Sequence, residues 1–481
     1  MENQFEMVAK TFAGLEGVLA EELRALGAVN VLPGRRMVSF EGDLAMLYKA
    51  NLSCRTALRI LKPFYKFKAR DPERLYEMVK EFDWGSMLSI DKTFAIDTVA
   101  NSDEFSHSRF VTYKVKDAIV DWFKDRYGED KRPGVRLTDA DVMINVHING
   151  TDVTLSLDSS GESLHKRVYR VAQTEAPINE VLAAGIILLS GWRGDCPLVD
   201  PMCGSGTFLI EAALIAANIN PGIYRRGFAF ERWKDFDAEL FDSLYNDDSG
   251  EREVKFKIYG ADISPKAVKI ATENIKSAGV GKYIDLQCRA ISTWTEAPQP
   301  AGVLVTNPPY GERISAPDMD ALYQTIGSKL KHVFTGYHAW IIGYRDEYFA
   351  RIGLAPSQKI PLYNGALECS LREYVIFEGD RKGFVRAGGK IGHGPAERAA
   401  SDRRSDRKGG FSRSGDRFAD RKDDTRGRFG GRPVAEPEPD PENPLAKRRN
   451  PQALKMLVGK QPSLKPQEGP IMRSRGWKKK S

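Results

Sequence analysis

Residues 303–311 read VLVTNPPYG, an apolar strand pattern that runs into a turn with two successive prolines. Proline fixes φ and carries no N–H, so the two prolines bring no backbone donor to this turn. The Pro308 carbonyl can therefore point outward. The Asn307 side-chain oxygen and the Pro308 carbonyl are then two acceptors placed to receive both hydrogens of an exocyclic NH₂ group. The ring of Tyr310 can stack on the base that carries this amine. The alternative is a plain Pro-Pro turn with a surface tyrosine, which its position after a buried strand disfavours.

Residues 200–207, DPMCGSGT, form a glycine turn between a short strand pattern and an apolar helical pattern. Gly204 and Gly206 allow positive φ and a close approach of a ligand to the backbone, and the following helix presents free N–H groups at its start. The turn lacks the Gly-Lys-Ser/Thr of a P-loop and the third glycine of a dinucleotide fingerprint. Two interpretations stay open with equal weight: a ligand-binding loop that begins at Asp200, or a turn that only packs a helix on a sheet.

An acidic residue, Asp262, ends the strand pattern of 258–262 and is followed by Ile263 and a helical pattern. In doubly wound folds an acid at the end of the second strand accepts hydrogen bonds from ribose hydroxyls. Such an acid usually follows the glycines by about 20 residues, whereas Asp262 follows Gly206 by 56 residues. We interpret 218–253 as an insertion that accounts for the difference. The alternative is that Asp262 only caps the helix.

The elements that must position these motifs follow from the periodicity of apolar residues. Residues 1–60 combine helical patterns with a short strand pattern, which predicts a small α+β unit. Strand and helix patterns continue to about residue 167, and the Asn149-Gly150 step between two alternating segments predicts a β-hairpin. From Pro177 to Phe377 strands and helices alternate, which is typical of a parallel sheet with crossover helices. The predicted fold class is α/β.

Charge is unevenly distributed along the 481 residues, although the net charge is only +7. Residues 381–481 hold 27 Lys and Arg against 12 Asp and Glu, a net of +15, so residues 1–380 carry a net of −8. The segment 385–481 is rich in Arg, Gly, Asp, Ser and Pro, and such a composition cannot bury enough apolar surface to fold. We therefore predict a disordered basic tail, whose Arg/Gly/Phe segments at 408–411 and 426–432 are typical of nucleic-acid binding through charge and stacking.

Several classes of protein are disfavoured by composition. The longest apolar stretch, 181–189, is far shorter than the ~20 residues that span a bilayer, and the N-terminus lacks the apolar core of a signal peptide. The five cysteines are scattered, without CxxC pairs or zinc-ligand spacing, and the six histidines show no ligand spacing either. We expect a cytoplasmic protein without membrane segments, without a disulfide framework and without a metal site.

The trio of motifs resembles the class I methyltransferases that use S-adenosylmethionine and act on exocyclic amines. Four segments are similar in sequence to the bacterial THUMP-domain RNA methyltransferases, namely to the N-terminal half of the RlmL-type 23S rRNA guanine-N2 methyltransferases. They are DPMCGSGTFLIEAA, TNPPYGERI, SLDSSGESLHKRVYR and APINEVLAAGII. The resemblance covers about residues 1–380. It implies an N-terminal ferredoxin-like unit over 1–58, an RNA-binding THUMP domain over 59–166 and a Rossmann-like methyltransferase domain over 167–384, followed by the tail.

The resemblance also implies roles for individual residues. It places Asp200, Gly204 and Gly206 around the methionine part of S-adenosylmethionine, and Asp262 with Ile263 at its ribose side. Asn307, Pro308 and Tyr310 would hold the guanine, with Asn307 also beside the cofactor. One departure concerns residues 287–291, QCRAI, where such enzymes often supply an acidic residue toward the adenine amine. The adenine contact is therefore left open, and the single methyltransferase module implies one base modification.

The expected partner is RNA, and the leading candidates are 23S rRNA and an assembly intermediate of the large subunit. Candidate phosphate contacts are Arg109, Lys114, Lys116 and the run 165–170, HKRVYR, although a charged run is equally often a solvated face. A tRNA guanine-N2 methyltransferase of the same architecture is the nearest alternative. A DNA amino-methyltransferase and a ribosome-assembly RNA chaperone without catalysis are weaker ones. The sequence leaves the modified nucleotide and the oligomeric state open.

Overall fold

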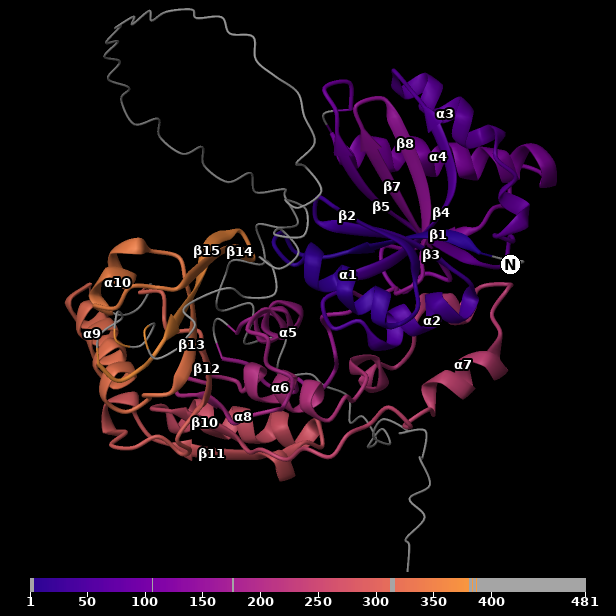
Figure 1. Ribbon diagram of the computed structural model, residues 1–481. Helices are drawn as coiled ribbons and strands as arrows, with labels where there is room; N and C mark the ends of the chain where they lie inside the picture. Colours follow the sequence, from indigo (N-terminus) through magenta and orange to yellow (C-terminus); the bar gives the residue numbers. More distant parts are fainter. Residues whose placement is uncertain are drawn as a thin grey trace, which may run out of the picture. The chain divides into compact units, whose positions relative to one another are not determined.

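The computed structural model describes residues 4–105, 107–174, 177–311 and 316–379, together with Gly383 and Arg386. They belong to one compact unit, Met1–Arg404, which contains two β-sheets (Figure 1). A second unit, Ser405–Ser481, and nearly all of the predicted basic tail lie outside the described residues. No helix within the described residues is long and apolar enough to cross a membrane.

The first sheet has eight strands in the order β2-β3-β1-β4-β8-β7-β5-β6. Its strands are β1 (Phe5–Lys10), β2 (Val29–Gly34), β3 (Met37–Gly42), β4 (Arg59–Lys68), β5 (Thr93–Asn101), β6 (Gly134–Val135), β7 (Val142–Asn149) and β8 (Asp152–Asp158). Its helices are α1 (Glu16–Ala25), α2 (Leu44–Ser53), α3 (Pro72–Glu81) and α4 (Ser108–Tyr127), with a 3₁₀ turn η1 (Trp84–Ser86). The predicted hairpin is confirmed, because β7 and β8 pair antiparallel around Gly150, whose φ is 59°.

The strand β4 is shared by the two N-terminal modules. On one side it pairs with β1, in the unit expected to be ferredoxin-like, and on the other it pairs with β8, in the expected THUMP domain. The two expected units therefore form one continuous sheet with a common core. The division between residues 58 and 59 stays a prediction, and it falls immediately before this shared strand.

The second sheet has seven strands in the order β11-β10-β9-β12-β13-β15-β14. Its strands are β9 (Leu198–Asp200), β10 (Ile258–Asp262), β11 (Ile284–Cys288), β12 (Gly302–Thr306), β13 (Tyr337–Gly343), β14 (Gln358–Asn364) and β15 (Leu367–Val375). The helices are α5 (Glu180–Leu189), α6 (Thr207–Ala216), α7 (Ala238–Tyr245), α8 (Pro265–Ser277), α9 (Ala316–His332) and α10 (Asp346–Arg351). Short 3₁₀ turns are η2 (Pro221–Tyr224), η3 (Ala229–Arg232), η4 (Gly281–Tyr283) and η5 (Ile291–Thr293).

The first five strands of this sheet's order pair in parallel, as predicted, but the last two do not. The strand β15 runs antiparallel to β13, and β14 runs antiparallel to β15. The expectation of a purely parallel sheet is therefore wrong at this edge, because a short hairpin turn replaces the crossover helix that a parallel strand requires. The strand β9 lies between β10 and β12, so the strand order reverses there. Ligands of open α/β sheets bind at the carboxyl ends of strands at such a switch point.

The predicted insertion, 218–253, contributes Phe228, Phe230, Trp233 and Phe241 to the core of the first sheet, whereas Ile219 and Tyr224 pack against the core of the second. The Phe230 ring stacks on Tyr48 of α2 at 4.5 Å between centroids, and Phe241 meets Tyr48 edge-on at 5.5 Å. A Cβ on Gly222 would lie 2.7 Å from the carbonyl oxygen of Leu52, so only glycine fits at that close approach. The insertion therefore adds aromatic side chains, from the part of the chain that builds the second sheet, to the core of the first sheet.

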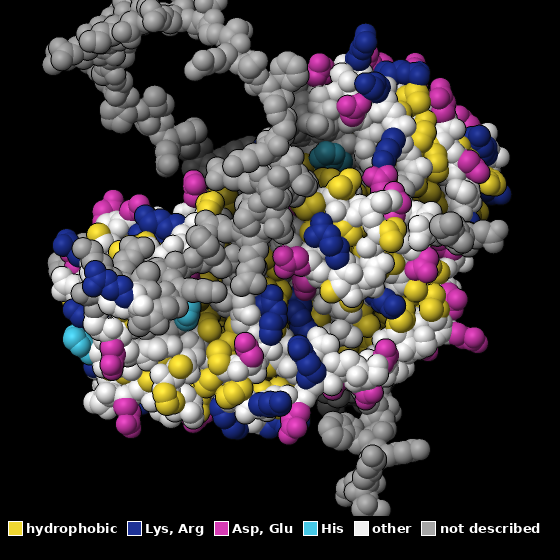
Figure 2. Space-filling model, viewed as in Figure 1, with side chains coloured by type: hydrophobic (Ala, Val, Ile, Leu, Met, Phe, Trp, Pro, Cys, Tyr) yellow, Lys and Arg dark blue, Asp and Glu magenta, His cyan; other side chains and the backbone are white. Residues whose placement is uncertain are grey.

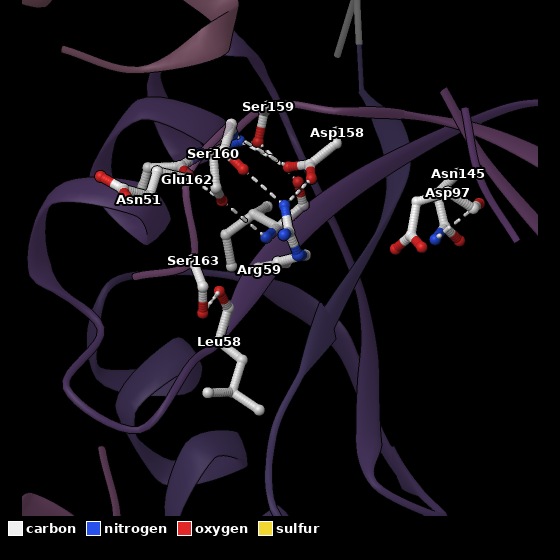
Figure 3. A network of polar contacts seen from close by, with 12 residues as sticks. Asn51, Leu58, Arg59, Asp97, Asn145, Asp158, Ser159, Ser160, Glu162 and Ser163 are labelled. Carbon is white, nitrogen blue, oxygen red and sulfur yellow. Dashed lines mark hydrogen bonds and ion pairs between the residues drawn. The ribbon is translucent and has the colours of Figure 1, made fainter. Parts of the chain in front are cut away.

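A buried polar network fixes the segment that follows β8 (Figure 3). The Arg59 guanidinium pairs with Asp158, and the Asn51 amide donates to Ser159 Oγ at 2.8 Å while its oxygen accepts from Ser160 Oγ at 2.6 Å. Burial raises the pKa of Asp158, and the Arg59 charge opposes that shift. From the insertion, Arg225 donates to the carbonyls of 160, 162, 163 and 166. These bonds satisfy the backbone of the connection between the two sheets.

Candidate active site

The glycine turn connects β9 to α6 and uses its two glycines differently. Both adopt left-handed φ, 53° at Gly204 and 81° at Gly206. A Cβ on Gly206 would lie 3.1 Å from the Cβ of Ala271, so this glycine lets α6 pack closely on α8. Among the described residues, a Cβ on Gly204 would have only Thr174 Oγ1 within 4 Å, at 3.8 Å. Gly206 therefore serves helix packing, and its contact with a cofactor stays a prediction, while Gly204 has open space around it within the described part of the chain.

Asp262 at the end of β10 is tied to the glycine turn. Its Oδ2 accepts a hydrogen bond from the Gly204 N–H at 2.9 Å, and its Oδ1 accepts one from the Ser264 N–H at 2.9 Å. The helix α8 is capped by the Ser264 side chain, which accepts from Ala267 N, so the alternative that Asp262 is the helix cap is wrong. The neighbouring Ile263 is 73% exposed, an unusual position for a large apolar side chain beside a carboxylate.

Asp200 at the end of β9 is fully buried beneath the same turn. Its Oδ1 accepts from the Thr306 hydroxyl at 2.8 Å and from the Met202 N–H at 3.2 Å. Burial raises the pKa of Asp200 to about 7, and the negative charge of Asp262 acts in the same direction while the two hydrogen bonds oppose it. The structure therefore holds a buried carboxyl group with a raised pKa at the end of the strand that leads into the glycine turn.

The Asn-Pro-Pro-Tyr turn follows β12 directly. The Asn307 Oδ1 atom is buried and has no hydrogen-bond partner within the described part of the chain. A buried amide oxygen without a donor costs about 1–3 kcal/mol, so an unpaired acceptor at this position is typical of a site that is completed by a ligand. Pro308 is buried and Pro309 is exposed, which places the turn at the rim of the sheet.

Tyr310 is fixed by the β14–β15 hairpin. Its hydroxyl lies 3.4 Å from Asn364 Nδ2, which donates to it, and 3.9 Å from Cys369 Sγ. Burial raises the pKa of Tyr310, so its phenol stays protonated. The ring meets Tyr344 at 5.4 Å between centroids with an interplanar angle of 62°. The β14–β15 hairpin therefore orients the Tyr310 side chain that the sequence analysis singled out, although that analysis missed the hairpin signal Asn364-Gly365.

Two arginines of the run 165–170 are structural, so their interpretation as phosphate contacts is wrong. Arg167 is 2% exposed, and its Nε lies 3.0 Å from Glu211 Oε1. The Arg170 guanidinium pairs with Glu180 at 2.6 Å. It also donates to Ser205 Oγ at 3.2 Å and to Thr207 Oγ1 at 3.0 Å, which are residues of the glycine turn and of the first turn of α6. Buried arginines of this kind satisfy internal acceptors instead of facing solvent.

Asn274 of α8 holds the backbone that runs from Arg170 toward the glycine turn. Its side-chain oxygen accepts from Val171 N and Ala172 N, and its amide donates to the carbonyls of Ala172 and Ser205 at 2.9 and 3.0 Å. The side chain is 1% exposed and uses both of its polar atoms. Sequence reasoning missed Asn274 and Arg170 as supports of the turn, because their partners are distant in sequence.

A separate cavity of about 360 Å³ lies beside β10 and β11. Tyr259, Asp285, Gln287, Arg289 and Trp294 contribute to its lining. The Arg289 guanidinium lies 4.4 Å from the centroid of the Trp294 ring. The backbone N–H of Arg289 donates to the backbone carbonyl of Asp262 at 3.0 Å. The lining contains neither the glycine turn nor Asn307, but it includes Gln287 and Arg289 of the segment 287–291, for which the adenine contact was left open.

The structure brings the predicted residues together through short connections. Gly204 bonds to Asp262, and Asp200 bonds to Thr306, the residue before Asn307. All lie at the carboxyl ends of three adjacent parallel strands, β10, β9 and β12. Open space at Gly204, the buried carboxyl of Asp200 and the exposed apolar Ile263 fit a cofactor with a cationic part, a ribose and an apolar base. No group of three or more potential metal ligands occurs among the described residues.

Three protein-family models match the chain in succession. The RlmL ferredoxin-like domain matches residues 6–61, the THUMP domain matches residues 69–158, and the RMKL-like methyltransferase domain matches residues 167–373. Among curated proteins, the putative RNA methyltransferase slr0064 of Synechocystis sp. is 40% identical over 367 residues, which cover 76% of this chain and 95% of that protein.

Longer relatives match in part. The ribosomal RNA large subunit methyltransferase K/L of Syntrophotalea carbinolica is 40% identical over 391 residues, covering 79% of this chain and 54% of that protein. The chain thus spans about half the length of this relative. The crystal structure of SMU.472, a putative methyltransferase complexed with SAH, is 32% identical, with a TM-score of 0.70 over 79% of this chain and 100% of that chain.

Fold and comparisons together define a class I methyltransferase that uses S-adenosylmethionine. The chain belongs to the family of RMKL-like methyltransferases that carry an RlmL ferredoxin-like domain and a THUMP domain before the catalytic domain.

Proposed function

We propose that this protein transfers a methyl group from S-adenosylmethionine to the exocyclic N2 amine of a guanosine in RNA, and that the RNA is 23S rRNA of the large ribosomal subunit. The observation that carries the proposal is the buried Asn307 Oδ1 at the carboxyl end of β12, which has no hydrogen-bond partner among the described residues. An aromatic amine has two N–H donors, and Asn307 Oδ1 with the Pro308 carbonyl can accept both. The names of two relatives, an RNA methyltransferase and an rRNA large subunit methyltransferase, support the substrate class.

Binding of the cofactor is assigned to the residues around the glycine turn. Asp200 and Gly204 would hold the methionine part, Asp262 would accept from the ribose hydroxyls, and Ile263 would cover the base. When bound, S-adenosylmethionine supplies a methyl group that is already electrophilic. The chain's own contribution is to orient the amine nitrogen in line with the methyl carbon and sulfur and to exclude water.

The acceptors at Asn307 and Pro308 also favour the reaction electronically. The lone pair of an aryl amine is delocalised into the ring, which makes the amine flat and a poor nucleophile. Two acceptors placed out of the ring plane stabilise the pyramidal nitrogen of the transition state more than the flat ground state, which is differential binding. Tyr310, held by Asn364, would stack on the guanine ring.

Access to such a pocket requires the target base to leave its stack. Enzymes that act on base atoms extrude the nucleotide or bind unpaired RNA. The N-terminal modules would bind neighbouring RNA by its shape and backbone. On the face shown in Figure 2, basic and acidic side chains are interspersed with apolar ones, in agreement with the net charge of −8 over residues 1–380. RNA binding is therefore expected to depend on local groups rather than on a uniformly basic surface.

The test is methyl transfer from labelled S-adenosylmethionine to protein-free 23S rRNA, unmodified bulk tRNA and duplex DNA in parallel. We expect label in the rRNA, recovered as N2-methylguanosine after nuclease digestion. Asn307→Ala should lower kcat by two or more orders of magnitude, while Asn307→Asp, which keeps an acceptor oxygen, should retain more activity.

The matched control is Asn246→Ala, because the Asn246 amide donates to an exposed helix carbonyl far along the chain from the turn. It should leave the rate unchanged. Label confined to tRNA or DNA would refute 23S rRNA as the substrate but would still support methyl transfer by this protein. Cofactor binding without transfer to any nucleic acid would favour a ribosome-assembly factor instead.

A further inference from the structure

A row of aromatic side chains surrounds the Asn-Pro-Pro-Tyr turn on the side of β13. Tyr344 follows β13 directly and contacts the Tyr310 ring. Tyr348 of α10 reaches the end of the same turn, since its Oη would lie 3.3 Å from a Cβ on Gly311. Tyr348 in turn stacks on Tyr323 at 5.5 Å between centroids, with an interplanar angle of 30°. The turn is thus supported by two tyrosines that are more than 30 residues away in sequence.

An exposed arginine lies on these two tyrosines. The Arg345 guanidinium carbon is 5.1 Å from the centroid of Tyr344 and 5.8 Å from that of Tyr348. Arg345 is exposed, and no ion pair joins it to another described residue. Of the acidic residues that follow it, Asp346 is already paired with Arg372, and Glu347 is exposed. The arginine therefore presents its positive charge beside the turn without an internal carboxylate partner in the described structure.

A hydrogen bond to the Tyr344 side chain uses part of the hydrogen-bonding edge of Arg345, and a guanidinium has further N–H groups for a second partner. When a guanidinium stacks on aromatic rings, its N–H groups still point outward in its plane, where they match two oxygens of a phosphate. Stacking also reduces the conformational entropy that the side chain loses on binding. A base held at Asn307 and Tyr310 carries its sugar and phosphates outward from the pocket, toward groups that surround the turn.

We propose that Arg345, carried by Tyr344 and Tyr348, binds the backbone phosphate adjacent to the target nucleotide and so holds the extruded base in the pocket. The proposal rests on the proposed function, because it assigns a second contact for the same RNA substrate. It concerns a contact to the backbone, so it contributes to affinity and to orientation but not to the choice of base.

The experiment compares full-length wild type with Arg345→Gln, Arg345→Lys and Arg351→Gln. Arg351 lies at the other end of α10 and is paired with Asp320 at 2.9 Å, so its substitution removes the same charge from the same helix. For each protein we would measure the Kd for 23S rRNA between 50 and 250 mM salt, the KM and kcat for methyl transfer, and the Kd for S-adenosylmethionine. The salt series is chosen because RNA binding releases counterions from the phosphates, so the logarithm of the binding constant falls linearly with the logarithm of the salt concentration.

For Arg345→Gln we expect a five- to twentyfold higher KM for RNA, and a slope of log K against log salt that is smaller by about 1. Arg345→Lys should keep most of the slope, because it keeps the charge, and should show a smaller rise in KM. Arg351→Gln should resemble wild type in both quantities, and the Kd for S-adenosylmethionine should be the same in all four proteins.

A wild-type KM and salt slope in Arg345→Gln would overturn the assignment. An equal loss in Arg351→Gln would also overturn it, since the effect would then be one of general charge. Failure of the proposed function has a different signature: wild type itself would then transfer no label to any RNA.

Discussion

The Thr306 hydroxyl donates a hydrogen bond to Asp200 Oδ1 across 2.8 Å, and this bond joins the two halves of the site. Asp200 ends the strand before the glycine turn, whereas Thr306 ends the strand before Asn307. Both side chains are fully buried. The glycine turn, where we propose that the cofactor binds, and the Asn-Pro-Pro-Tyr turn, where we propose that the base binds, are thus connected by a buried side-chain contact between adjacent parallel strands.

Cofactor affinity should depend on pH through Asp200. Its pKa is raised to about 7 in the ligand-free protein, so the carboxyl is largely protonated below that value. A cationic ligand favours the ionised form, so binding should lower this pKa and release a proton. Affinity for S-adenosylmethionine should therefore rise with pH, by up to about tenfold per pH unit below 7, and level off above 8.

Calorimetry between pH 5.5 and 8.5, in two buffers of different ionisation enthalpy, measures both the Kd and the proton release. The variant Asp200→Asn should bind more weakly and without this pH dependence. A wild-type Kd that is constant over the range would show that Asp200 does not interact with the charged part of the cofactor.

Removal of the hydroxyl in Thr306→Val should destabilise the protein and shift the pH profile. The substitution keeps the shape but removes the donor to Asp200, at a cost of about 1–3 kcal/mol for the unsatisfied buried group. Loss of this hydrogen bond, which lowers the Asp200 pKa, should move the midpoint of the affinity profile above 7. Denaturant unfolding and the same calorimetric titration measure the two effects.

The control for this substitution is Thr325→Val, because the Thr325 hydroxyl donates to a carbonyl on the exposed surface of α9. We expect less than about 0.5 kcal/mol of destabilisation there. Equal effects of both substitutions would contradict a special role of the bond between the strands.

The two glycines of the turn should respond differently to alanine. Gly206→Ala introduces both a strained φ and a Cβ 3.1 Å from that of Ala271, so α6 and α8 must separate. We expect a loss of about 2–4 kcal/mol in the free energy of unfolding. Gly204→Ala has a strained φ but open space, so we expect about 1–2 kcal/mol with a clear loss of S-adenosylmethionine affinity.

Urea unfolding and cofactor binding distinguish these outcomes in the same preparations. The comparison is internally controlled, since both substitutions add one methyl group within the same turn. If Gly204→Ala binds the cofactor as tightly as wild type, the open space at Gly204 does not belong to the cofactor site.

Arg170 should support cofactor binding without contacting the substrate. It donates to Ser205 and Thr207 while paired with Glu180. Arg170→Lys keeps the charge but cannot span these partners with one planar group. We expect an increase of three- to tenfold in the KM for S-adenosylmethionine, with an unchanged Kd for RNA.

Lys166→Arg is a suitable control, because Lys166 belongs to the same run but is exposed and paired with Glu162. It should leave both quantities unchanged. A parallel loss of RNA affinity in Arg170→Lys would instead place this residue at the RNA surface.

The parts of the structure that the sequence predicted are those whose causes are local. The Asn149-Gly150 hairpin, the glycine turn and the Pro-Pro turn each depend on the backbone preferences of two or three adjacent residues. The resemblance placed Gly204 and Asp262 around one cofactor, which stays a prediction, and the structure joins these two residues by a hydrogen bond.

The parts that could not be predicted depend on partners far apart in the chain. The run 165–170 reads as a basic surface, yet Arg167 faces Glu211 and Arg170 faces Glu180 in the interior. The turn between β14 and β15 carries Asn364-Gly365, the same hairpin signal as Asn149-Gly150, which the sequence analysis did not use. No short pattern, however, indicates that Asn364 reaches Tyr310. The same limit applies to Arg345, whose importance becomes visible only when Tyr344 and Tyr348 are seen beside the turn.

The shared strand β4 bears on how such proteins can be recombined. Because β4 pairs with both β1 and β8, a chimera joined at residue 58 would place two strands from different parents in one sheet, with unmatched side chains on both faces. The aromatic residues of 218–253 extend this dependence into the catalytic part of the chain. The natural unit of exchange between homologues is therefore residues 1–166 together with 218–253, two segments that must be inherited from the same parent.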